Sequence, residues 1–171
     1  MKIKTYMDFC ENINKLAFSA FMKHKFNLNA PRVFFDTYDE NSFGFNLEGH
    51  WLAVLPKSLC LVDGSEVMTD EKYQFNFENF APRDEEHFEC HRTNRIEIVK
   101  DGRANVELVL FDPEDSTADD KWINKKYADV FELANRVVGG AKWHNGVYFY
   151  LDDRLLGLVL PYKHLKKENE K

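Results

Sequence analysis

The sequence predicts an α+β domain in which two helices pack on a largely antiparallel sheet. Apolar residues recur at helical spacing in two segments, residues 6–25 and 124–138, and short β-type runs follow each segment. Fifteen phenylalanines among 171 residues also suit broad sheet faces packed by large rings. We therefore expect one domain over residues 1–163, built from two helix-plus-strands halves, and a charged tail at 164–171 that frays.

The first helix is predicted over residues 6–25. Thr5, with Asp8 three residues later, resembles a helix start, and Pro31 ends the segment because proline disfavours helical angles in the residue before it. One broad face of this helix is apolar and carries Phe9, Cys10, Ile13, Leu16, Ala17, Ala20, Phe21 and His24.

Short β-type runs follow at residues 32–36, 43–47 and 51–55, with turn-forming residues between the first two. Residues 58–65 predict a fourth strand that ends at an Asp–Gly turn. The polar and acidic middle of the chain contains one more alternating run, at residues 72–80.

A hairpin is predicted next, because residues 95–99 and 106–111 flank an Asp101–Gly102 pair whose glycine can supply a positive φ. The acidic run that follows, 112–120, invites comparison with a calcium-binding loop. No glycine occupies the sixth position that an EF-hand loop requires, so we interpret the run as a solvated loop.

The order of the first half then recurs. The segment 124–138 predicts a helix with Gly139 and Gly140 as its C-cap. Two strands, at residues 147–151 and 155–160, are joined by a short acidic turn.

Composition bounds the function. Hydrophobic residues make up 44% of the chain and charged residues 30%, and the formal net charge is -6, so there is no overall basic footprint for nucleic acid. Three widely spaced cysteines predict reduced thiols rather than a disulfide framework. With no signal-peptide or membrane-spanning pattern, the expectation is a soluble, cytoplasmic protein.

Three neighbouring side chains, His87, Cys90 and His91, could bind zinc or iron. A fourth ligand is not identifiable by spacing, and Cys90 and His91 would point to opposite faces of an extended segment. A polar strand edge or loop is the plainer interpretation, and no metal or cofactor is expected. A metal-dependent enzyme using these three residues remains an alternative function.

Other catalytic patterns lack support, since no Gly-rich phosphate loop, no GxSxG and no HExxH occurs. The first helix and the entry to the second carry a candidate DNA-facing set of cations that could contact phosphates without reading bases: Lys15, Lys23, Lys121, Lys125 and Lys126. Interspersed carboxylates make a plain solvated face the interpretation that we favour there.

Residues 43–56, FGFNLEGHWLAVLP, resemble the bacterial-type DNA sliding clamp, the ring-shaped processivity factor of replicative polymerases, in which a strand pair carries a pattern like TDGHRLAV. The Gly-His pair and the Leu-Ala-Val run match, while Trp51 replaces the arginine. Near the other end, INKKYADVFELANRVVGG is similar to the helix of the clamp's second half. LLGLVLPYK is similar to the clamp ending VVMPMR, with Val159 and Pro161 matching. The resemblance covers about residues 6–56 and 123–163.

This resemblance implies a non-enzymatic protein that acts in DNA replication, or on mobile-element or phage DNA. In clamps the two motifs help to form an apolar pocket that grips short peptides of protein partners. Carried over residue by residue, the partner-binding set is Gly49, His50, Trp51, Leu52, Val159, Leu160, Pro161 and Tyr162. It also implies contact with double-stranded DNA without sequence specificity, and a homo-oligomer.

Two departures from the family matter. A clamp subunit contains three such domains, whereas this chain has room for one. In clamps the two halves of the pocket come from adjacent domains, whereas here both motifs lie in a single domain. Two alternatives therefore stay open: an interaction or inhibitor protein that retains only the clamp fold, and a plain tight turn at Gly49 followed by a half-buried strand.

Overall fold

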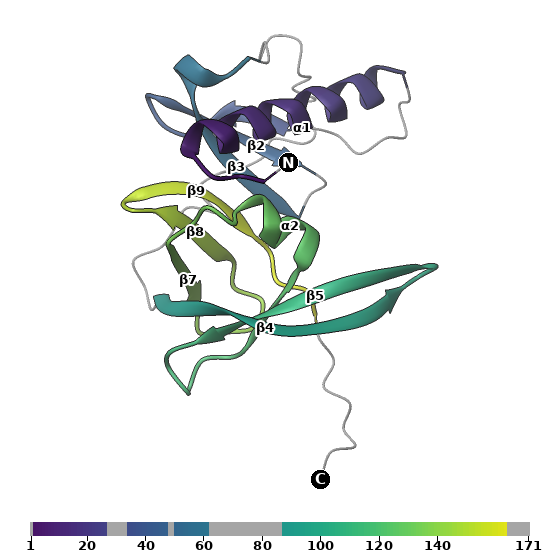
Figure 1. Cartoon of the computed structure of the whole chain (residues 1–171), viewed down its shortest axis with the longest axis vertical. Helices are drawn as coiled ribbons and strands as arrows, with labels where there is room; N and C mark the ends of the chain where they lie inside the picture. The colour runs from purple at the N-terminus through teal and green to yellow at the C-terminus, as the bar shows by residue number, and fades with distance from the viewer. Residues whose placement is uncertain (1, 27–33, 48–49, 62–86, 164–171) are drawn as a thin grey trace.

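The computed structural model describes residues 2–26, 34–47, 50–61 and 87–163. It is an α+β domain, as predicted, and these described residues form two α-helices and nine strands in one sheet (Figure 1). The elements are α1 (Tyr6–Phe26), β1 (Phe34–Thr37), β2 (Ser42–Leu47), β3 (Trp51–Pro56), a 3₁₀ turn (Lys57–Leu59), β4 (His87–Asp101), β5 (Ala104–Pro113), β6 (Lys121–Asn124), α2 (Lys125–Val130), β7 (Arg136–Gly140), β8 (Val147–Leu151) and β9 (Arg154–Val159).

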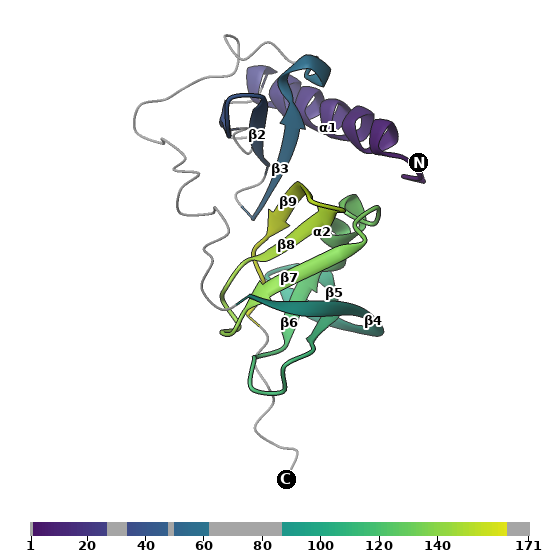
Figure 2. The ribbon, with the colours of Figure 1, turned by 90° about the vertical axis from the view of Figure 1, so that its left-hand side faces the viewer.

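The strand order is β1-β2-β3-β9-β8-β7-β4-β5-β6, and every pairing among the described strands is antiparallel. Two units share one plan: α1 is followed by the meander β1-β2-β3, and α2 is followed by the meander β7-β8-β9. They join edge to edge where β3 pairs with β9, and the strands succeed one another along the long axis in Figure 2. The strands β4, β5 and β6 extend the sheet beyond β7.

Helix α1 begins at the predicted cap. The Asp8 carboxylate accepts from the backbone N–H groups of Lys4 and Thr5 at 3.0 and 2.8 Å, and the Thr5 hydroxyl accepts from the Asp8 N–H at 3.1 Å. These hydrogen bonds lower the pKa of the Asp8 carboxyl. Phe9, Ile13 and others of the predicted face are buried against the sheet.

The predicted strand at 58–65 is wrong over its described part, because Lys57–Leu59 form a 3₁₀ turn and Cys60 and Leu61 belong to no strand. The cause is the buried Asn14 of α1. Its amide donates to the carbonyl of Leu59 at 2.8 Å, and its carbonyl accepts from the N–H of Leu61 at 2.9 Å. These backbone groups therefore need no neighbouring strand. The run 72–80 lies outside the described residues.

The second helix is much shorter than predicted. Asn124 caps it, accepting from the N–H of Lys126 at 3.0 Å, but the helix ends after six residues and 136–140 form β7. Gly139 and Gly140 are not a C-cap. They lie in this strand because their neighbours approach closely: an added Cβ would lie 3.3 Å from Cys90 Sγ at Gly139, and 2.6 Å from the Asn145 side chain at Gly140.

Both predicted hairpins are confirmed. Gly102 has φ +61° in the β4–β5 turn, where Asp101 pairs with Ala104. Asp152 has φ +52° in the β8–β9 turn. Asn135 supports this turn, since its amide donates to the Asp152 carboxylate and its carbonyl accepts from the Asp152 N–H, both at 2.8 Å.

Phenylalanine rings fill the space between the helices and the sheet. Phe131, just after α2, lies 5.0 Å from Phe149 of β8 and 5.9 Å from Phe9 of α1, measured between ring centroids. The Phe131 ring also lies over Gly157 of β9, where a Cβ would come within 2.6 Å of the ring and would collide with the carbonyl oxygen of Leu52. The junction of the two units therefore requires a residue without a side chain at position 157.

We predict that Gly157→Ala lowers the free energy of unfolding by about 2–4 kcal/mol, since β9 must move away from β3 or Phe131 must be displaced. Urea denaturation measures this change. Gly146→Ala is the matched control, because its nearest side-chain atom lies at an ordinary 3.7 Å, and we expect a change within about 0.5 kcal/mol. Equal effects of the two substitutions would show that the contact at Gly157 does not hold the junction.

Candidate functional site

The two clamp-like motifs lie side by side in the structure. In the β3–β9 pairing Trp51 is opposite Val159 and Leu52 is opposite Leu158. The contact continues past the end of β9, because the N–H of Leu160 donates to the carbonyl of His50 at 2.9 Å. The two motifs are far apart in the sequence, and they are thus neighbours in one sheet.

Several members of the predicted partner-binding set are core residues. Trp51 and Val159 point into the main core, at 4% and 0% exposure. Leu52 points to the opposite face of the sheet, where it packs in a second buried cluster with Leu158 and Tyr148. These three side chains can support a binding surface, but they offer almost none themselves. Gly49 lies outside the described residues.

The accessible part of the site is a stack of aromatic rings. The exposed His50 ring stacks on Tyr127 of α2, with 6.4 Å between centroids, and Tyr127 stacks on Trp51 at 6.1 Å. The Lys126 ammonium lies 5.7 Å from the Tyr127 ring centroid. We call His50, Tyr127 and Trp51 the aromatic stack. It leads from the surface to the core, and it adds Tyr127, which the sequence reasoning did not assign to the site.

Trp51 Nε1 is buried and has no hydrogen-bond partner within the described part of the chain. An unpaired buried N–H costs about 1–3 kcal/mol, so most such groups in native proteins are paired. This donor is the only buried side-chain nitrogen or oxygen among the described residues that lacks a partner, and it belongs to the stack.

The rest of the predicted set diverges from the stack. Leu160 and Pro161 are partly exposed, and the chain then reaches β6, where the N–H of Tyr162 donates to the carbonyl of Trp122 at 2.7 Å. Tyr162 packs there with Leu108 and Leu110. Desolvation and the neighbouring Asp101 raise the pKa of the Tyr162 hydroxyl. Tyr162 therefore lies beside β5 and β6 and not at the aromatic stack, so the carried-over set does not form one continuous surface.

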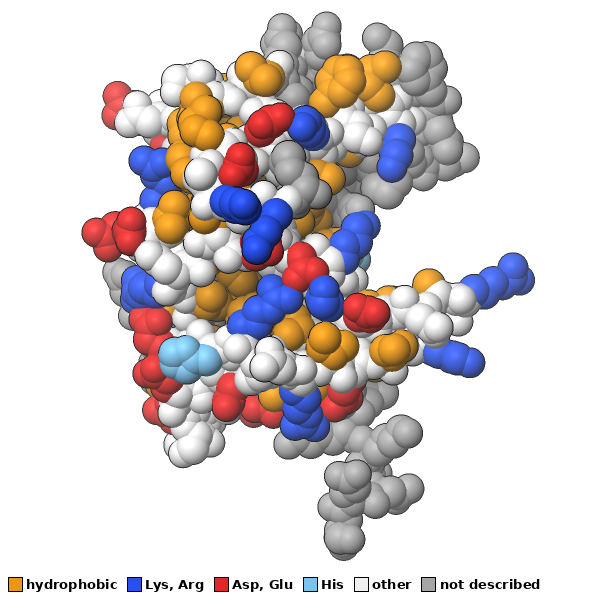
Figure 3. Space-filling view, in the orientation of Figure 1, with side chains coloured by type: hydrophobic (Ala, Val, Ile, Leu, Met, Phe, Trp, Pro, Cys, Tyr) orange, Lys and Arg blue, Asp and Glu red, His pale blue; other side chains and the backbone are white. Residues whose placement is uncertain are grey.

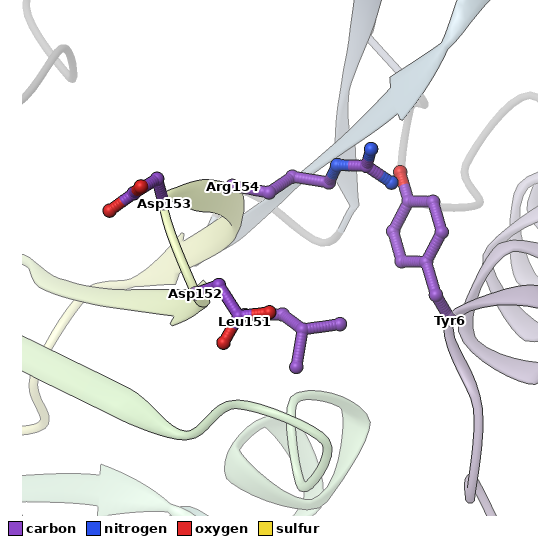
Figure 4. A pocket seen from close by; sticks show the side chains of 5 residues that line it. All are labelled: Tyr6, Leu151, Asp152, Asp153 and Arg154. Atoms are coloured by element: carbon purple, nitrogen blue, oxygen red, sulfur yellow. The ribbon is translucent and has the colours of Figure 1, made fainter.

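An open pocket lies elsewhere, between the start of α1 and the β8–β9 turn (Figure 4). The Arg154 side chain reaches across it, with its guanidinium carbon 4.2 Å from the centroid of the Tyr6 ring, while Asp153 points away. Desolvation and the neighbouring Cys10 thiol raise the pKa of Tyr6 to about 12, although Arg154 acts in the opposite direction. The Asp152 carboxylate is already bonded to Asn135. This pocket is unrelated to the motifs.

The predicted DNA-facing lysines differ in their surroundings. Lys15 pairs with Glu11 at 2.7 Å and Lys125 with Asp129 at 2.6 Å, whereas Lys23 is exposed near the end of α1. Cations and carboxylates are interspersed over the face in Figure 3. Paired, mixed charges of this kind make a weak phosphate-binding surface.

Lys121 cannot face DNA, because its side chain is fully buried in β6, and that part of the prediction is wrong. Its ammonium donates to the carbonyl of Lys142, and its stem lies beside Gly139. Burial lowers the pKa of Lys121 to about 8, and burial also raises the pKa of the neighbouring Cys90 thiol to about 11. A thiol with a raised pKa is a poor nucleophile.

The side chains of the alternative metal site point to different surroundings. Cys90 is buried, the exposed His91 ring lies 2.6 Å from the Glu114 carboxylate, and the His87 ring packs edge-on against Tyr148. In the portion that the structure covers, no group of three or more His, Cys, Asp or Glu is placed to hold a metal ion. Cys10, Cys60 and Cys90 are not joined in disulfides.

We predict that Lys121→Met stabilises the protein by about 1–3 kcal/mol below pH 8, because it removes a buried charge. The folded pKa of about 8 lies below the ordinary 10.5, so the unfolded chain binds more protons between these values. The free energy of unfolding of the wild type should therefore increase relative to that of the variant as pH rises from 8 to 10.5. Denaturation at a series of pH values measures this difference in stability. Cys90 lowers the stability of both proteins between about pH 9 and 11, so its contribution drops out of the difference. A constant difference would contradict the assignment, and the exposed Lys15→Met is the control.

We predict that Trp51→Ala costs about 3–5 kcal/mol in the free energy of unfolding, because it leaves a large cavity beside Tyr127 and Phe131. Trp51→Phe should cost much less, since it keeps a ring in the stack and removes the unpaired N–H. Trp143→Ala, at a tryptophan that is 41% exposed, serves as the control and should cost below about 1 kcal/mol. Similar losses for Trp51→Ala and Trp143→Ala would show that Trp51 is not a core residue.

Across the ranges that the structure describes, neither helix is long and apolar enough to cross a membrane. Comparison of the chain with known protein families, with curated proteins and with solved structures finds no match in any of the three.

Proposed function

We propose that this chain is a non-enzymatic, clamp-like binding protein that holds a short peptide of a protein partner at the aromatic stack, in DNA replication or on mobile-element or phage DNA. The observation that carries the proposal is the β3–β9 junction, which brings the two clamp-like motifs into register as the seam between two helix-plus-meander units. The clamp resemblance rests on those two motifs in that order.

The stack has the chemistry of a peptide-binding hot spot. His50 presents an exposed ring on a rigid base of Tyr127 and Trp51, and the partly exposed Leu160 is hydrogen-bonded to the His50 backbone. Aromatic groups around an apolar centre are typical of the few residues that dominate binding energy. The partner expected from this chemistry is an extended segment with an apolar or aromatic anchor.

DNA contact is the subordinate part of the proposal. Lys15 and Lys125 are engaged with carboxylates, and the net charge of -6 opposes a strong electrostatic attraction. Any contact would go to phosphates, without reading bases, through Lys23 and Lys126 together with those paired lysines. A protein that retains only the clamp fold would show neither peptide nor DNA binding.

The test is fluorescence anisotropy with a labelled peptide that carries the clamp-binding motif of a bacterial replicative polymerase. We expect micromolar binding, which Tyr127→Ala and His50→Ala each weaken about tenfold because each removes a ring from the stack. Light scattering with and without a DNA duplex tests the DNA part in the same preparation.

Matched controls are Trp143→Ala and His144→Ala, because these residues form another His–aromatic pair, with 5.6 Å between ring centroids, away from the junction. They should leave the affinity for the peptide unchanged. Absence of peptide binding by the wild type, or equal losses in the control variants, would overturn the proposed site.

A further inference from the structure

The strands β4 and β5 form an arm that projects from the body of the molecule (Figures 1 and 3). It runs from Ile96 to the turn at Gly102 and back to Val109. A register shift between Arg92 and Ile96 separates this arm from the base of the sheet. Two isoleucines on one face of the arm are exposed, Ile96 at 48% and Ile98 at 67%.

One edge of the arm has no neighbour among the described strands. Among the described strands, β7 pairs with this side of β4 only from His87 to Glu89. In a hairpin with a two-residue turn the pair that flanks the turn, here Asp101 and Ala104, exchanges both backbone hydrogen bonds. Alternation then directs the N–H and C=O groups of Ile96, Ile98 and Lys100 away from β5. An open edge with exposed apolar side chains is a template for another strand.

We propose that this edge pairs with the same edge of a second copy of the chain, antiparallel, about a two-fold axis at Ile98. In an allowed register, each outward-directed residue of one copy lies opposite an outward-directed residue of the other. The charges of the side chains that then face one another distinguish between the allowed registers. With Val99 on the axis Glu97 would face the second copy's Asp101, and with Glu97 on the axis two glutamates would meet. With Ile96 on the axis Arg95 would face Glu97, but Asn94 would then have to pair inside the register shift between Arg92 and Ile96. With Ile98 on the axis Arg95 faces Asp101 in both halves, and the pairing residues Ile96, Ile98 and Lys100 all lie in the regular part of the arm.

This register also joins the apolar side chains. Ile96 and Ile98 of both copies form one continuous strip on one face of a four-stranded sheet, with Lys100 opposite the second copy's Ile96. The Arg95 side chain is 63% exposed; its guanidinium now contacts Glu97 at 3.2 Å and lies 5.3 Å from the Trp122 ring centroid. In the dimer it would exchange these exposed contacts for the second copy's Asp101, without a change in the backbone. An interface of this size belongs to the small, reversible class, so the dimer should depend on concentration.

The inference does not rest on the proposed function, since the arm is separate from the aromatic stack. Sedimentation velocity of the full chain tests it. We expect a monomer–dimer equilibrium with a dissociation constant below about 1 mM. Ile98→Pro should raise this constant at least tenfold, because it removes the outward N–H but leaves the hydrogen bonds to β5. Ile98→Lys should act in the same direction and covers the case in which the proline variant fails to fold, which circular dichroism would reveal.

Phe18→Lys is the matched control, because Phe18 is an equally exposed apolar residue of α1, at 58%. A wild type that stays monomeric up to about 1 mM, or a dimer that Phe18→Lys abolishes while the Ile98 variants retain it, would overturn the proposal.

The register has its own test. Arg95→Asp and Asp101→Arg should each weaken self-association, because each places like charges opposite one another. A mixture of the two variants should recover dimers close to the wild-type level, since the carboxylates of one chain at positions 95 and 101 then face the guanidinium groups of the other. Failure of the mixture to associate better than either variant alone would exclude an axis at Ile98.

Discussion

The close approach of β9 to β3 at Gly157 is the constraint on which the rest of the structure depends. The strand must come near enough for the Leu52 carbonyl and the Phe131 ring to occupy the space of a side chain. Only then can Trp51 and Val159 lie opposite one another and the two meanders form one sheet. Phe131 contacts rings from α1, β3 and β8, so the same approach also unites the core of both units.

The aromatic stack is a consequence of that seam. Residue 50 ends a turn at the rim of the sheet while residue 51 is already inside, so one backbone step leads from solvent to core. Tyr127 bridges the two because α2 begins directly after β6, which holds the helix over the seam. A peptide bound at the stack would therefore be linked to the core through ring contacts, since Trp51 contacts both Tyr127 and Phe131.

Features that a few adjacent residues determine were predictable from the sequence. The Thr5–Asp8 cap, the Asn124 cap and the Gly102 turn all depend on contacts within a few positions. Gly139 was misread because glycine both ends helices and admits close neighbours, and the neighbour here, Cys90, is remote in sequence. The burial of Lys121 was also not predictable, because the carbonyl that accepts from its ammonium belongs to Lys142, which is remote in sequence. Tyr127 could not be assigned to the site from the sequence, because stacking across a sheet seam has no sequence period.

The hydrogen bond from the Tyr162 N–H to the Trp122 carbonyl has a meaning beyond the site. Strand β6 is the last described strand of the sheet, and without this hydrogen bond its outer edge would expose unpaired backbone groups that can pair with another chain. Tyr162 occupies part of that edge, so the segment after β9 hinders edge-to-edge association of sheets. Shortening the chain before Tyr162 would uncover this edge and the cluster of Leu108, Leu110 and Trp122, and the expected consequence is aggregation through β6.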